Sequence, residues 1–252
     1  MNSNSKEFPI SEIFTSPQGE GVWSGTMMTF VRLAGCTVGK PYPKDKYQTF
    51  QGEGKINGNA LPIYTEECTL YDGRKFPCDT DYRKKKVMTA AQILEEIPKN
   101  VTHVCITGGE PLMHDLYSLV KPLRLANKEI HLETSGTKRP KSMVELENIW
   151  VTVSPKKPLL PEMVLRANEF KILVDDQFDP DLKVCQGPDT WASWAEIAKL
   201  GVVVWLQPVN FEHEVNPDNV KLCMKWMEKY PQFRVSLQMH KVLSLFTEER
   251  IR

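Results

Sequence analysis

The stretch that best indicates the fold of this chain is Thr102-His103-Val104-Cys105-Ile106-Thr107-Gly108-Gly109-Glu110-Pro111. The first six residues predict a short strand, and the glycines and proline that follow predict a loop. A helical pattern covers 115–126, and a second strand is predicted at 129–134. A strand, a helix and another strand in this order predict parallel strands joined by a helical crossover.

The same alternation continues on both sides of this stretch. Further strands are predicted at 27–33, 150–153, 169–174, 202–206 and 233–237. Further helices are predicted at 89–97, 190–200 and 217–230. About six strands follow residue 88, fewer than the eight of a closed barrel, so the pattern predicts an α/β fold with an open, partial parallel β/α barrel. We expect one domain over residues 1–252, because neither a linker nor an internal repeat is visible.

Composition and charge narrow the functional classes. The chain has 252 residues, of which 41% are hydrophobic, and its 32 basic and 32 acidic residues cancel. This balance gives no indication of a nucleic-acid partner or an anionic membrane surface. No apolar run approaches the roughly 20 residues of a membrane span, and residues 1–7 lack a signal-peptide core. We expect a cytoplasmic protein that contacts neither nucleic acid nor membrane directly.

Three of the six cysteines, Cys36, Cys68 and Cys78, fall in the turn-rich stretch 35–82. In a cytoplasmic protein this favours metal ligation or free thiols over disulfides. Three thiolates on a 4Fe–4S cluster would leave one iron without a protein ligand, which is the open position that a catalytic metal site needs. The polar segment 39–67 is interpreted as a surface insertion within this cluster-binding loop.

The other cysteines have simpler interpretations. Cys105 lies inside a predicted strand, and Cys223 lies on the apolar face of a predicted helix, so both are expected to serve packing. Cys185 falls in a predicted loop and is the reserve candidate for a metal ligand.

Polar residues collect just after the predicted strands, at the edge where parallel α/β proteins carry their sites. Taken alone, these turns around glycine and proline have equally ordinary structural interpretations. Arg32 is more unusual, because it shares a strand face with Met28 and Phe30. A charge on an apolar face is costly unless paired. Arg32 is therefore expected to meet an internal carboxylate or to bind an anionic ligand, and its planar fork suits a carboxylate.

Several of these segments together resemble the radical S-adenosylmethionine (SAM) enzymes. They are Gly35-Cys36, Cys78-Asp79-Thr80, Thr107-Gly108-Gly109-Glu110-Pro111 and Gln207-Pro208. Within that superfamily the chain is similar to the 7-carboxy-7-deazaguanine synthases over about residues 8–241. The closer likeness is carried by Glu12-Ile13-Phe14, Gln18-Gly19-Glu20-Gly21, Arg32-Leu33-Ala34-Gly35-Cys36, Glu133-Thr134-Ser135-Gly136, Ser154-Pro155-Lys156 and Gln238-Met239-His240-Lys241.

The resemblance implies a radical ring contraction of 6-carboxy-5,6,7,8-tetrahydropterin to 7-carboxy-7-deazaguanine, with loss of ammonia, on the way to queuosine and related deazapurines. SAM would bind the open iron, and an electron from the cluster would cleave it to a 5′-deoxyadenosyl radical that abstracts a substrate hydrogen. The resemblance also implies Mg²⁺, a flavodoxin-like or other electron donor, and a homodimer. The protein itself would position the cofactors and the substrate and would exclude competing reactions.

The resemblance assigns Cys36 and Cys78 to the first and last cluster ligands, Cys68 to the middle one, and Thr80 to Mg²⁺. The superfamily pattern is Cys-x3-Cys-x2-Cys, whereas here 31 residues separate Cys36 from Cys68 and nine separate Cys68 from Cys78. Synthases of this family have a longer spacing between the first and second cluster cysteines. A long loop can still bring them together, because the closure entropy grows only with the logarithm of loop length. Cys185 stays the reserve.

The resemblance also implies contacts to SAM and to the pterin. The implied SAM contacts are Gly108, Gly109, Glu110, Ser154, Pro155, Lys156, Gln207, Pro208, Val209 and Asn210. The implied substrate contacts are Pro17, Gln18, Gly19, Glu20, Arg32, Thr107, Glu133 and His240. Glu133 and His240 are the catalytic candidates; Arg32 would take the pterin carboxylate, and Glu133 would accept hydrogen bonds from the guanidine-like edge of the ring. The proline-bearing C-terminal tail of the family has no counterpart in 246–252.

Two other functions are compatible with parts of this pattern. Another radical SAM enzyme, such as a glycyl-radical activase, would share Cys36, Cys78 and the 108–111 loop, but would not need Arg32. A zinc-stabilised interaction module on the three cysteines would need a fourth ligand and tetrahedral closure, and residues 39–67 contain neither His nor Cys.

Overall fold

The computed structural model describes residues 6–39, 55–56, 59–60, 67–70, 73–78, 80, 86–186, 191–210, 215–239 and 242. Its main feature is a nine-stranded sheet. The strands are β1 (Glu7–Pro17), β2 (Met27–Leu33), β7 (Lys86–Thr89), β8 (His103–Gly108), β9 (Glu129–Thr134), β10 (Trp150–Val153), β11 (Glu169–Val174), β14 (Val203–Pro208) and β15 (Phe233–Val235). Their order across the sheet is β15-β14-β11-β10-β9-β8-β2-β1-β7.

Across the sheet, each strand from β2 through β8, β9, β10, β11 and β14 to β15 pairs in parallel with the next. β1 pairs antiparallel with both β2 and β7. The sheet order ends at β15 and β7 without closing, so the expected open α/β sheet is confirmed. The expected count of about six strands is too low, because the antiparallel edge was not anticipated. Pro9 and a register shift between Ile10 and Glu12 interrupt the strand pattern of β1.

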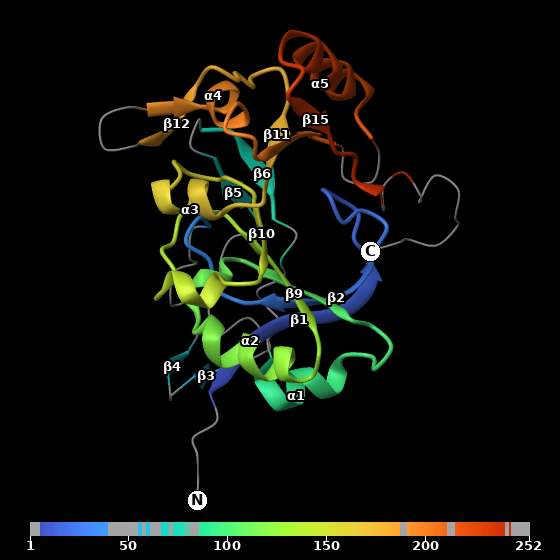
Figure 1. The fold of residues 1–252 in the computed structure, drawn as a ribbon, viewed down its shortest axis with the longest axis vertical. Coiled ribbons are helices and arrows are strands. Elements are labelled where there is room, and N and C mark those ends of the chain that lie inside the picture. Colours follow the sequence, from blue (N-terminus) through green and yellow to red (C-terminus); the bar gives the residue numbers. More distant parts are fainter. Residues whose placement is uncertain are drawn as a thin grey trace, which may run out of the picture.

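Helices follow the outer side of the sheet from one end to the other, as Figure 1 shows. They are α1 (Ala90–Glu96), α2 (Leu116–Leu125), α3 (Pro161–Arg166), α4 (Trp194–Ala198) and α5 (Pro217–Lys229), with 3-10 turns η2 (Pro111–Met113) and η3 (Met143–Leu146). The capping box of Thr89 and the Asn216 cap are present as expected. The helix predicted over 190–200 is wrong at its start, because Trp191–Ser193 forms strand β13 and Ser193 caps α4.

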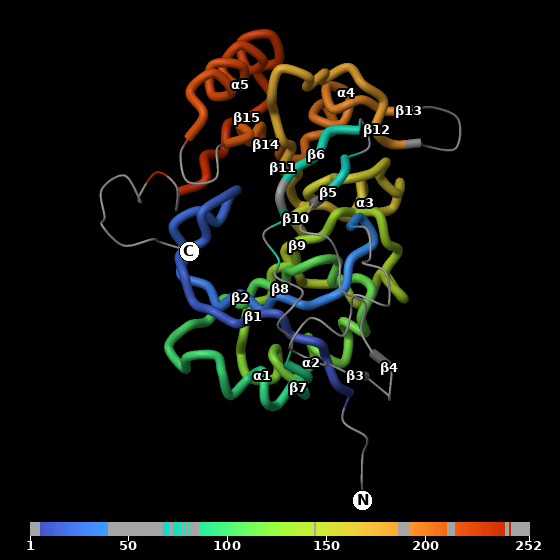
Figure 2. Tube along the Cα trace, turned by 180° about the vertical axis from the view of Figure 1, so that it is seen from behind, coloured from blue at the N-terminus to red at the C-terminus, as the bar shows by residue number. Residues whose placement is uncertain are grey.

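Three hairpins lie outside the main sheet. β12 (Lys183–Gln186) pairs with β13, β3 (Lys55–Ile56) pairs with β4 (Asn59–Ala60), and β5 (Glu67–Thr69) pairs with β6 (Lys75–Pro77). Most of the insertion expected at 39–67 lies outside the described residues. Figure 2 shows the β5–β6 hairpin beside β10 and β11, near the carboxyl ends of the parallel strands.

The two faces of the sheet differ in chemistry. Side chains such as Val31, Ile106 and Leu132 point outward and form one apolar core with residues of the helices, among them Leu119 and Trp194. The parallel registers place the alternate residues together on the opposite, inner face. We define the inner face by Met28, Phe30, Arg32, Cys105, Thr107, His131, Glu133, Thr152, Glu169, Lys171 and Trp205. It is apolar only around Met28, Phe30 and Cys105 and is otherwise polar.

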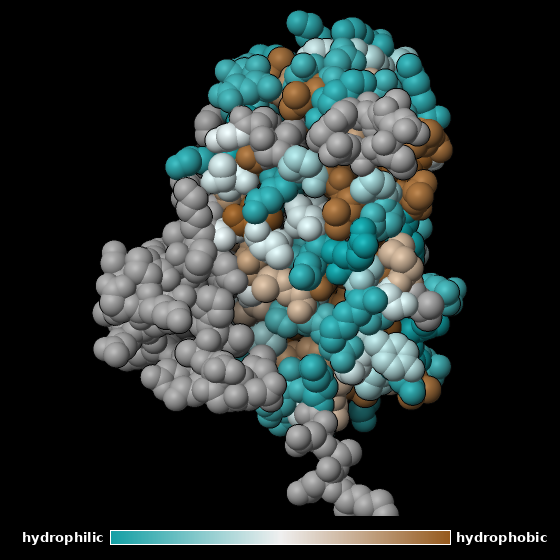
Figure 3. Space-filling model, turned by 90° about the vertical axis from the view of Figure 1, so that its left-hand side faces the viewer, coloured by the Kyte–Doolittle hydropathy of each residue, from teal (hydrophilic) through white to brown (hydrophobic). Residues whose placement is uncertain are grey.

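Two surface properties bear on function. On the side shown in Figure 3, hydrophobic residues appear in small groups separated by hydrophilic ones. No helix in the described part of the chain has both the length and the apolar character needed to cross a bilayer.

Candidate active site

The three cysteines of stretch 35–82 come together at the carboxyl edge of the sheet. Cys36 follows β2, and its Sγ accepts hydrogen bonds from the backbone N–H groups of Val38 and Gly39 at 3.2 and 3.3 Å. Cys68 and Cys78 lie on the β5–β6 hairpin, and their thiols are hydrogen-bonded to each other. That bond, burial and the charges of Cys78 and Cys36 raise the pKa of Cys68 well above its usual range, so all three sulfurs are electrostatically coupled.

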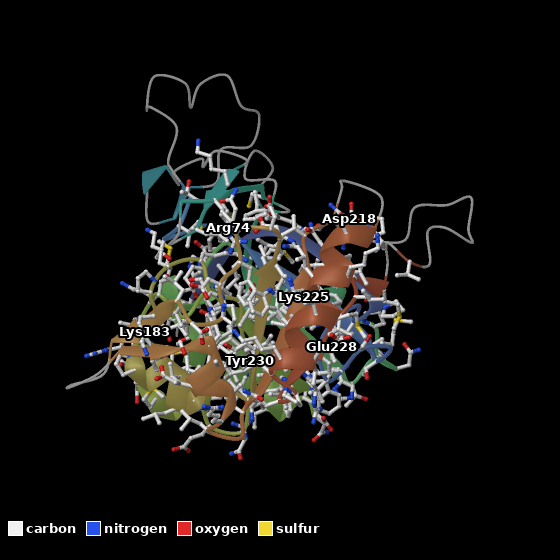
Figure 4. All side chains as sticks on the ribbon, turned by 90° about the horizontal axis from the view of Figure 1, so that it is seen from above. Arg74, Lys183, Asp218, Lys225, Glu228 and Tyr230 are labelled. Atoms are coloured by element: carbon white, nitrogen blue, oxygen red, sulfur yellow. The ribbon has the colours of Figure 1, made fainter. Side chains whose placement is uncertain are left out.

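An ion pair attaches the β5–β6 hairpin to the main sheet. Arg74 Nη1 lies 2.5 Å from Asp175 Oδ1, just beyond the end of β11. The Arg74 guanidinium also lies over the Phe76 ring, 5.7 Å from its centroid, and the backbone of Leu70 donates to the Arg74 carbonyl. Figure 4 shows Arg74 at the hairpin, above the strand ends. The hairpin that carries two thiols is therefore held over the carboxyl edge.

The other three cysteines are packed. Cys105 is fully buried on the inner face, Cys185 lies in β12 within the core, and Cys223 lies in α5 within the core. Burial raises the pKa of all three, that of Cys223 to about 12. The packing roles expected for Cys105 and Cys223 agree with these positions, and Cys185 is packed in the core as well.

Three thiols are the ligand set of a 4Fe–4S cluster that leaves one iron open. All six cysteines are free. A structural zinc would need a fourth ligand that converges on the same ion. The amide N–H groups on Cys36 would also compensate thiolate charge.

The glycine loop after β8 lies directly against the end of β2. Gly108 has φ +128°, and a Cβ there would overlap the Leu33 carbonyl oxygen. The Gly109 N–H donates to that oxygen at 3.1 Å, and the Glu110 N–H donates to Gly35 O at 2.8 Å. The two segments expected to contact the cluster and SAM are therefore adjacent.

Glu110 is fully buried, and its carboxylate is occupied by protein donors. Oε1 accepts from Thr134 Oγ1 at 2.6 Å and from Leu112 N at 3.1 Å. Oε2 accepts from Ser135 N at 3.0 Å and also from Ser135 Oγ. In the structure Glu110 ties the end of β8 to the end of β9, and its expected contact to SAM stays a prediction.

The two remaining SAM segments follow β10 and end β14. Lys156 Nζ donates to Ser154 Oγ at 3.0 Å, and its charge acts on Cys68, which places 154–156 next to the cysteines. Gln207 instead donates to Glu20 Oε1 at 2.9 Å. Asn210 Nδ2 donates to Gln238 at 3.0 Å. The end of β14 thus borders the residues expected to bind substrate.

Arg32 projects from the inner face of β2 toward the hairpin. Its Nη1 lies 3.4 Å from Thr80 Oγ1, and its Nε lies 3.8 Å from Glu12. The Nε is buried and has no hydrogen-bond partner. The expected internal carboxylate is thus present only at the edge of ion-pair distance, and a buried donor remains for a ligand. Thr80 is buried beside Arg32.

Opposite charges meet at the centre of the inner face. Lys171 Nζ lies 2.5 Å from Glu20 Oε2 and 3.0 Å from Glu133 Oε1. Thr107 Oγ1 donates to Glu133 Oε2 at 2.9 Å, and Gln18 Nε2 lies 3.4 Å from Oε1. Burial raises the pKa of Glu133, but the charge of Lys171 and the hydrogen bonds from Lys171 and Thr107 together lower it below its usual value. Gln18, Glu20, Thr107 and Glu133, far apart in sequence, therefore form one cluster.

The loop 18–26 forms the floor of this site. Gly21 has φ +71°, and a Cβ there would lie 2.6 Å from Glu169 Oε1. Glu169 accepts hydrogen bonds from Val22 N, Thr152, Trp150 and Trp205 at 2.7–3.2 Å. The Gly19 carbonyl accepts from Met239 N, beyond β15. Pro17 is the last residue of β1 and leads into this loop.

Lys171 and Glu169 were not anticipated, although the strand Glu169–Val174 was. Their alternation within that strand places both charges on one face, the same signal that singled out Arg32. His240 lies outside the described residues, as do Asp79 and 243–252, so the expected role of His240 stays a prediction.

Comparisons with known proteins give a consistent result. No family model matches the chain. It is 31% identical to a 7-carboxy-7-deazaguanine synthase of Synechocystis sp., over 94% of this chain and 93% of that protein. It is 30% identical to a 7-carboxy-7-deazaguanine synthase of Buchnera aphidicola, over 94% of this chain and 99% of that protein. The crystal structure of QueE from Escherichia coli is similar with a TM-score of 0.58 and 27% identity, covering 93% of this chain and 95% of that one.

The likeness spans nearly the whole length of this chain and of each of these proteins, which makes it a relationship of complete folds and not of an isolated motif. We conclude that this chain belongs to the 7-carboxy-7-deazaguanine synthase family.

Proposed function

We propose that this protein is a 7-carboxy-7-deazaguanine synthase, a radical SAM carbon–nitrogen lyase. It contracts the ring of 6-carboxy-5,6,7,8-tetrahydropterin with loss of ammonia, in the biosynthesis of queuosine or related deazapurines. The observation that carries the proposal is the contact of Cys68 with Cys78 within electrostatic reach of Cys36, despite 31 intervening residues after Cys36. Membership of the synthase family supports it and disfavours the activase and zinc-module alternatives.

Cys36, Cys68 and Cys78 would hold a 4Fe–4S cluster. When bound, the cluster supplies the electron that cleaves SAM to the 5′-deoxyadenosyl radical. Positively polarised groups of the chain surround the cysteine ligands of the cluster. The N–H groups of Val38 and Gly39 point at Cys36 Sγ, and the Lys156 ammonium lowers the pKa of Cys68, opposing its other neighbours. Metal ligation needs the thiolate form, and the Lys156 ammonium is the neighbour that favours it at Cys68.

SAM would bind along the strand ends that border the cysteines. Gly108 and Gly109 allow close backbone approach. The segments Ser154-Pro155-Lys156 and Gln207-Pro208-Val209-Asn210 flank the same edge. Glu110 would act there mainly by fixing the loop, because its own carboxylate is already hydrogen-bonded to Thr134 and Ser135. Holding SAM between rigid strand ends would keep its radical near one substrate hydrogen.

The pterin would bind on the inner face beside the cluster edge. The buried Nε of Arg32 has no hydrogen-bond partner and suits the substrate carboxylate. Glu133, kept ionised by Lys171, would accept hydrogen bonds from paired N–H groups of the ring. The proposed substrate set is completed by Pro17, Gln18, Gly19, Glu20, Thr107 and His240.

Thr80 is proposed to ligate Mg²⁺. Its hydroxyl is a hard oxygen donor, which Mg²⁺ prefers together with water and substrate oxygens. A divalent cation at Thr80 would lie close to the Arg32 guanidinium, 3.4 Å from the hydroxyl. The carboxylate of the substrate would relieve this repulsion, so we propose that Mg²⁺ and the pterin bind together.

The remaining proposals concern partners and location. We propose that a flavodoxin-like or other donor reduces the cluster and that the enzyme acts as a homodimer, both from the family relationship. We propose a cytoplasmic location, because free thiols and an iron–sulfur centre require a reducing compartment. We also propose that residues 1–252 form one domain, because the main sheet takes strands from both ends of the described chain.

The test is anaerobic reconstitution with iron and sulfide, followed by SAM, dithionite, Mg²⁺ and carboxytetrahydropterin, with mass spectrometry of the products. We expect a brown protein that forms 7-carboxy-7-deazaguanine, and a Cys68→Ala variant that forms none. A brown protein that cleaves SAM but leaves the pterin unchanged would contradict the substrate. A colourless protein with bound zinc would contradict the reaction class.

A further inference from the structure

Lys171 is a buried, charged lysine on the inner face of the main sheet. It lies in the middle of β11, and its side chain is 8% exposed. Lysine is rarely buried to this degree unless it is paired. Its Nζ contacts two carboxylates, Glu20 at 2.5 Å and Glu133 at 3.0 Å. These partners come from the loop after β1 and from β9, so the ammonium joins three separate parts of the site.

Each of the two carboxylates accepts from three donors among the described residues, and the longest of these contacts lies at Glu133. Glu20 Oε1 accepts from the amides of Gln207 and Gln238 at 2.9 and 3.0 Å, and its Oε2 accepts from Lys171. Among the described residues, Glu133 accepts from Lys171 at 3.0 Å, from the Thr107 hydroxyl at 2.9 Å and from the Gln18 amide at the longer distance of 3.4 Å. A carboxylate has about four acceptor sites, so Glu133 keeps acceptor capacity for a ligand.

We propose that Lys171 is a positioning residue for the ring contraction, which holds Glu133 and Glu20 together as two carboxylates so that Glu133 presents only acceptor oxygens to the N–H edge of the substrate. This inference rests on the proposed function, because it takes the substrate to be a reduced pterin that offers paired N–H donors. Lys171 would act through Glu133 and would not touch the reacting atoms.

The physical reason lies in the repulsion between the two acids. Burial raises the pKa of Glu133, and Glu20 raises it too, while Lys171 lowers it. Without the ammonium, two buried carboxylates around one site would share a proton near neutral pH. A protonated Glu133 turns one acceptor into an O–H donor, which would face an N–H donor of the substrate.

Other charged groups that face Glu133 do not titrate near neutral pH. Burial lowers the pKa of His131 to about 4 and raises the pKa of Cys105 far above its usual range. Among the described residues, the titratable and charged groups around Glu133 are Lys171 on β11, Glu20 in the loop 18–26, Arg32 on β2, Cys105 on β8 and His131 on β9. Of these groups, only the two glutamates would give a pH dependence that appears in Lys171→Met and not in the wild type.

The test compares Lys171→Met with Lys171→Arg in the reconstituted enzyme, measuring kcat and KM for carboxytetrahydropterin from pH 6 to pH 9. In Lys171→Met we expect KM to rise about tenfold or more at pH 6 and to return toward the wild-type value as pH increases, because each pH unit below a pKa lowers the ionised fraction about tenfold. Lys171→Arg keeps the cation and should follow the flat wild-type profile.

The matched control is Lys183→Met. Lys183 also pairs with a glutamate, at 2.7 Å from Glu196, but it is half-exposed and lies at the molecular edge in Figure 4. It should match the wild type at every pH. An equal, pH-independent loss in the Met and Arg variants of Lys171 would overturn the inference, and so would a Lys171→Met enzyme that behaves like the wild type.

A second measurement separates this inference from the proposed function. The thermal midpoint of the substrate-free holoprotein should fall more steeply from pH 5 to pH 8 in Lys171→Met than in the wild type, because an acid whose pKa is raised in the folded state loses stability as pH increases through that pKa. Parallel curves would overturn the inference even if no deazaguanine were formed. If Lys171→Met does not fold, adding Glu20→Gln should restore folding, and failure of that pair would overturn it too.

Discussion

At the residue scale, Gly108 shows how closely the site segments approach each other. It ends β8 with φ +128°, a conformation that side chains other than glycine rarely adopt. The space that a Cβ would need is taken by the backbone of Leu33 at the end of β2. Because backbone cannot move aside as a flexible side chain can, the position requires glycine for two independent reasons.

We therefore predict that Gly108→Ala destabilises the protein severely, by roughly 3 kcal/mol or more, from strain and overlap together. Gly201→Ala is the matched control, because Gly201 has φ +86° but open space around its Cβ position. That variant should cost only the conformational strain of about 1–2 kcal/mol. Urea unfolding measures both. Equal costs would show that the contact with Leu33 contributes nothing.

At the element scale, an ion pair joins the β5–β6 hairpin to the main sheet. It is two short strands of three residues each, too small to be stable alone. The Arg74–Asp175 ion pair connects it to the end of β11, and the Arg74 side chain is 5% exposed. The hairpin carries Cys68 and Cys78, so its attachment bears directly on any cluster bound there.

We predict that Arg74→Met loosens the cluster without unfolding the main sheet. A hydrogen-bonded charge pair of this kind contributes about 1.5–3 kcal/mol, so iron release to a chelator should become about tenfold faster or more. Bleaching of the brown colour measures the rate.

Lys86→Met is the control for this prediction, because it removes the exposed ion pair of Lys86 with Glu96. Exposed pairs contribute little, so its bleaching rate should stay at the wild-type value. An unchanged rate in Arg74→Met would show that the hairpin is held by other contacts.

At the scale of the whole molecule, the polar inner face makes stability depend on pH. Near the amino ends of β8 and β9, His103 Nδ1 lies 3.0 Å from His131 Nε2, and Trp23 packs against both rings. Burial lowers the pKa of His131 to about 4, with a further contribution from His103. The unfolded chain binds a proton at His131 below about pH 6.5 that the folded chain takes up only near pH 4. Stability therefore falls as pH decreases through this window.

We predict that His131→Gln weakens this acid sensitivity. Between pH 7 and pH 5 the wild type should lose about 2 kcal/mol more of its free energy of unfolding than the variant does, since one pKa unit corresponds to about 1.4 kcal/mol. Urea unfolding at the two pH values measures the difference. Parallel losses in the two proteins would mean that His131 is protonated in the folded state at pH 5.

The sequence by itself determined the class of fold and the segments of the site. Alternating strand and helix patterns predicted an open parallel α/β sheet, because the outer face of each strand is apolar and each crossover helix carries its own period and caps. The turns after the strands also predicted the edge of the sheet that carries the site, because their polar, glycine and proline residues follow each strand directly in the sequence. Cys36, Cys68, Cys78, Arg32 and the 108–111 loop were all predicted as site residues from the residues near them in the chain and from the family resemblance.

Only the tertiary structure decided which side chains meet. Lys171 contacts Glu20 across 151 positions, and Arg74 contacts Asp175 across 101. The antiparallel strand β1, interrupted by Pro9, likewise gains its place by pairing with β2 and β7. Such contacts depend on the register of the parallel strands and on how the loop 18–26 folds beneath them, and neither leaves a local periodic signal. The charge network on the inner face is therefore a property of the folded sheet.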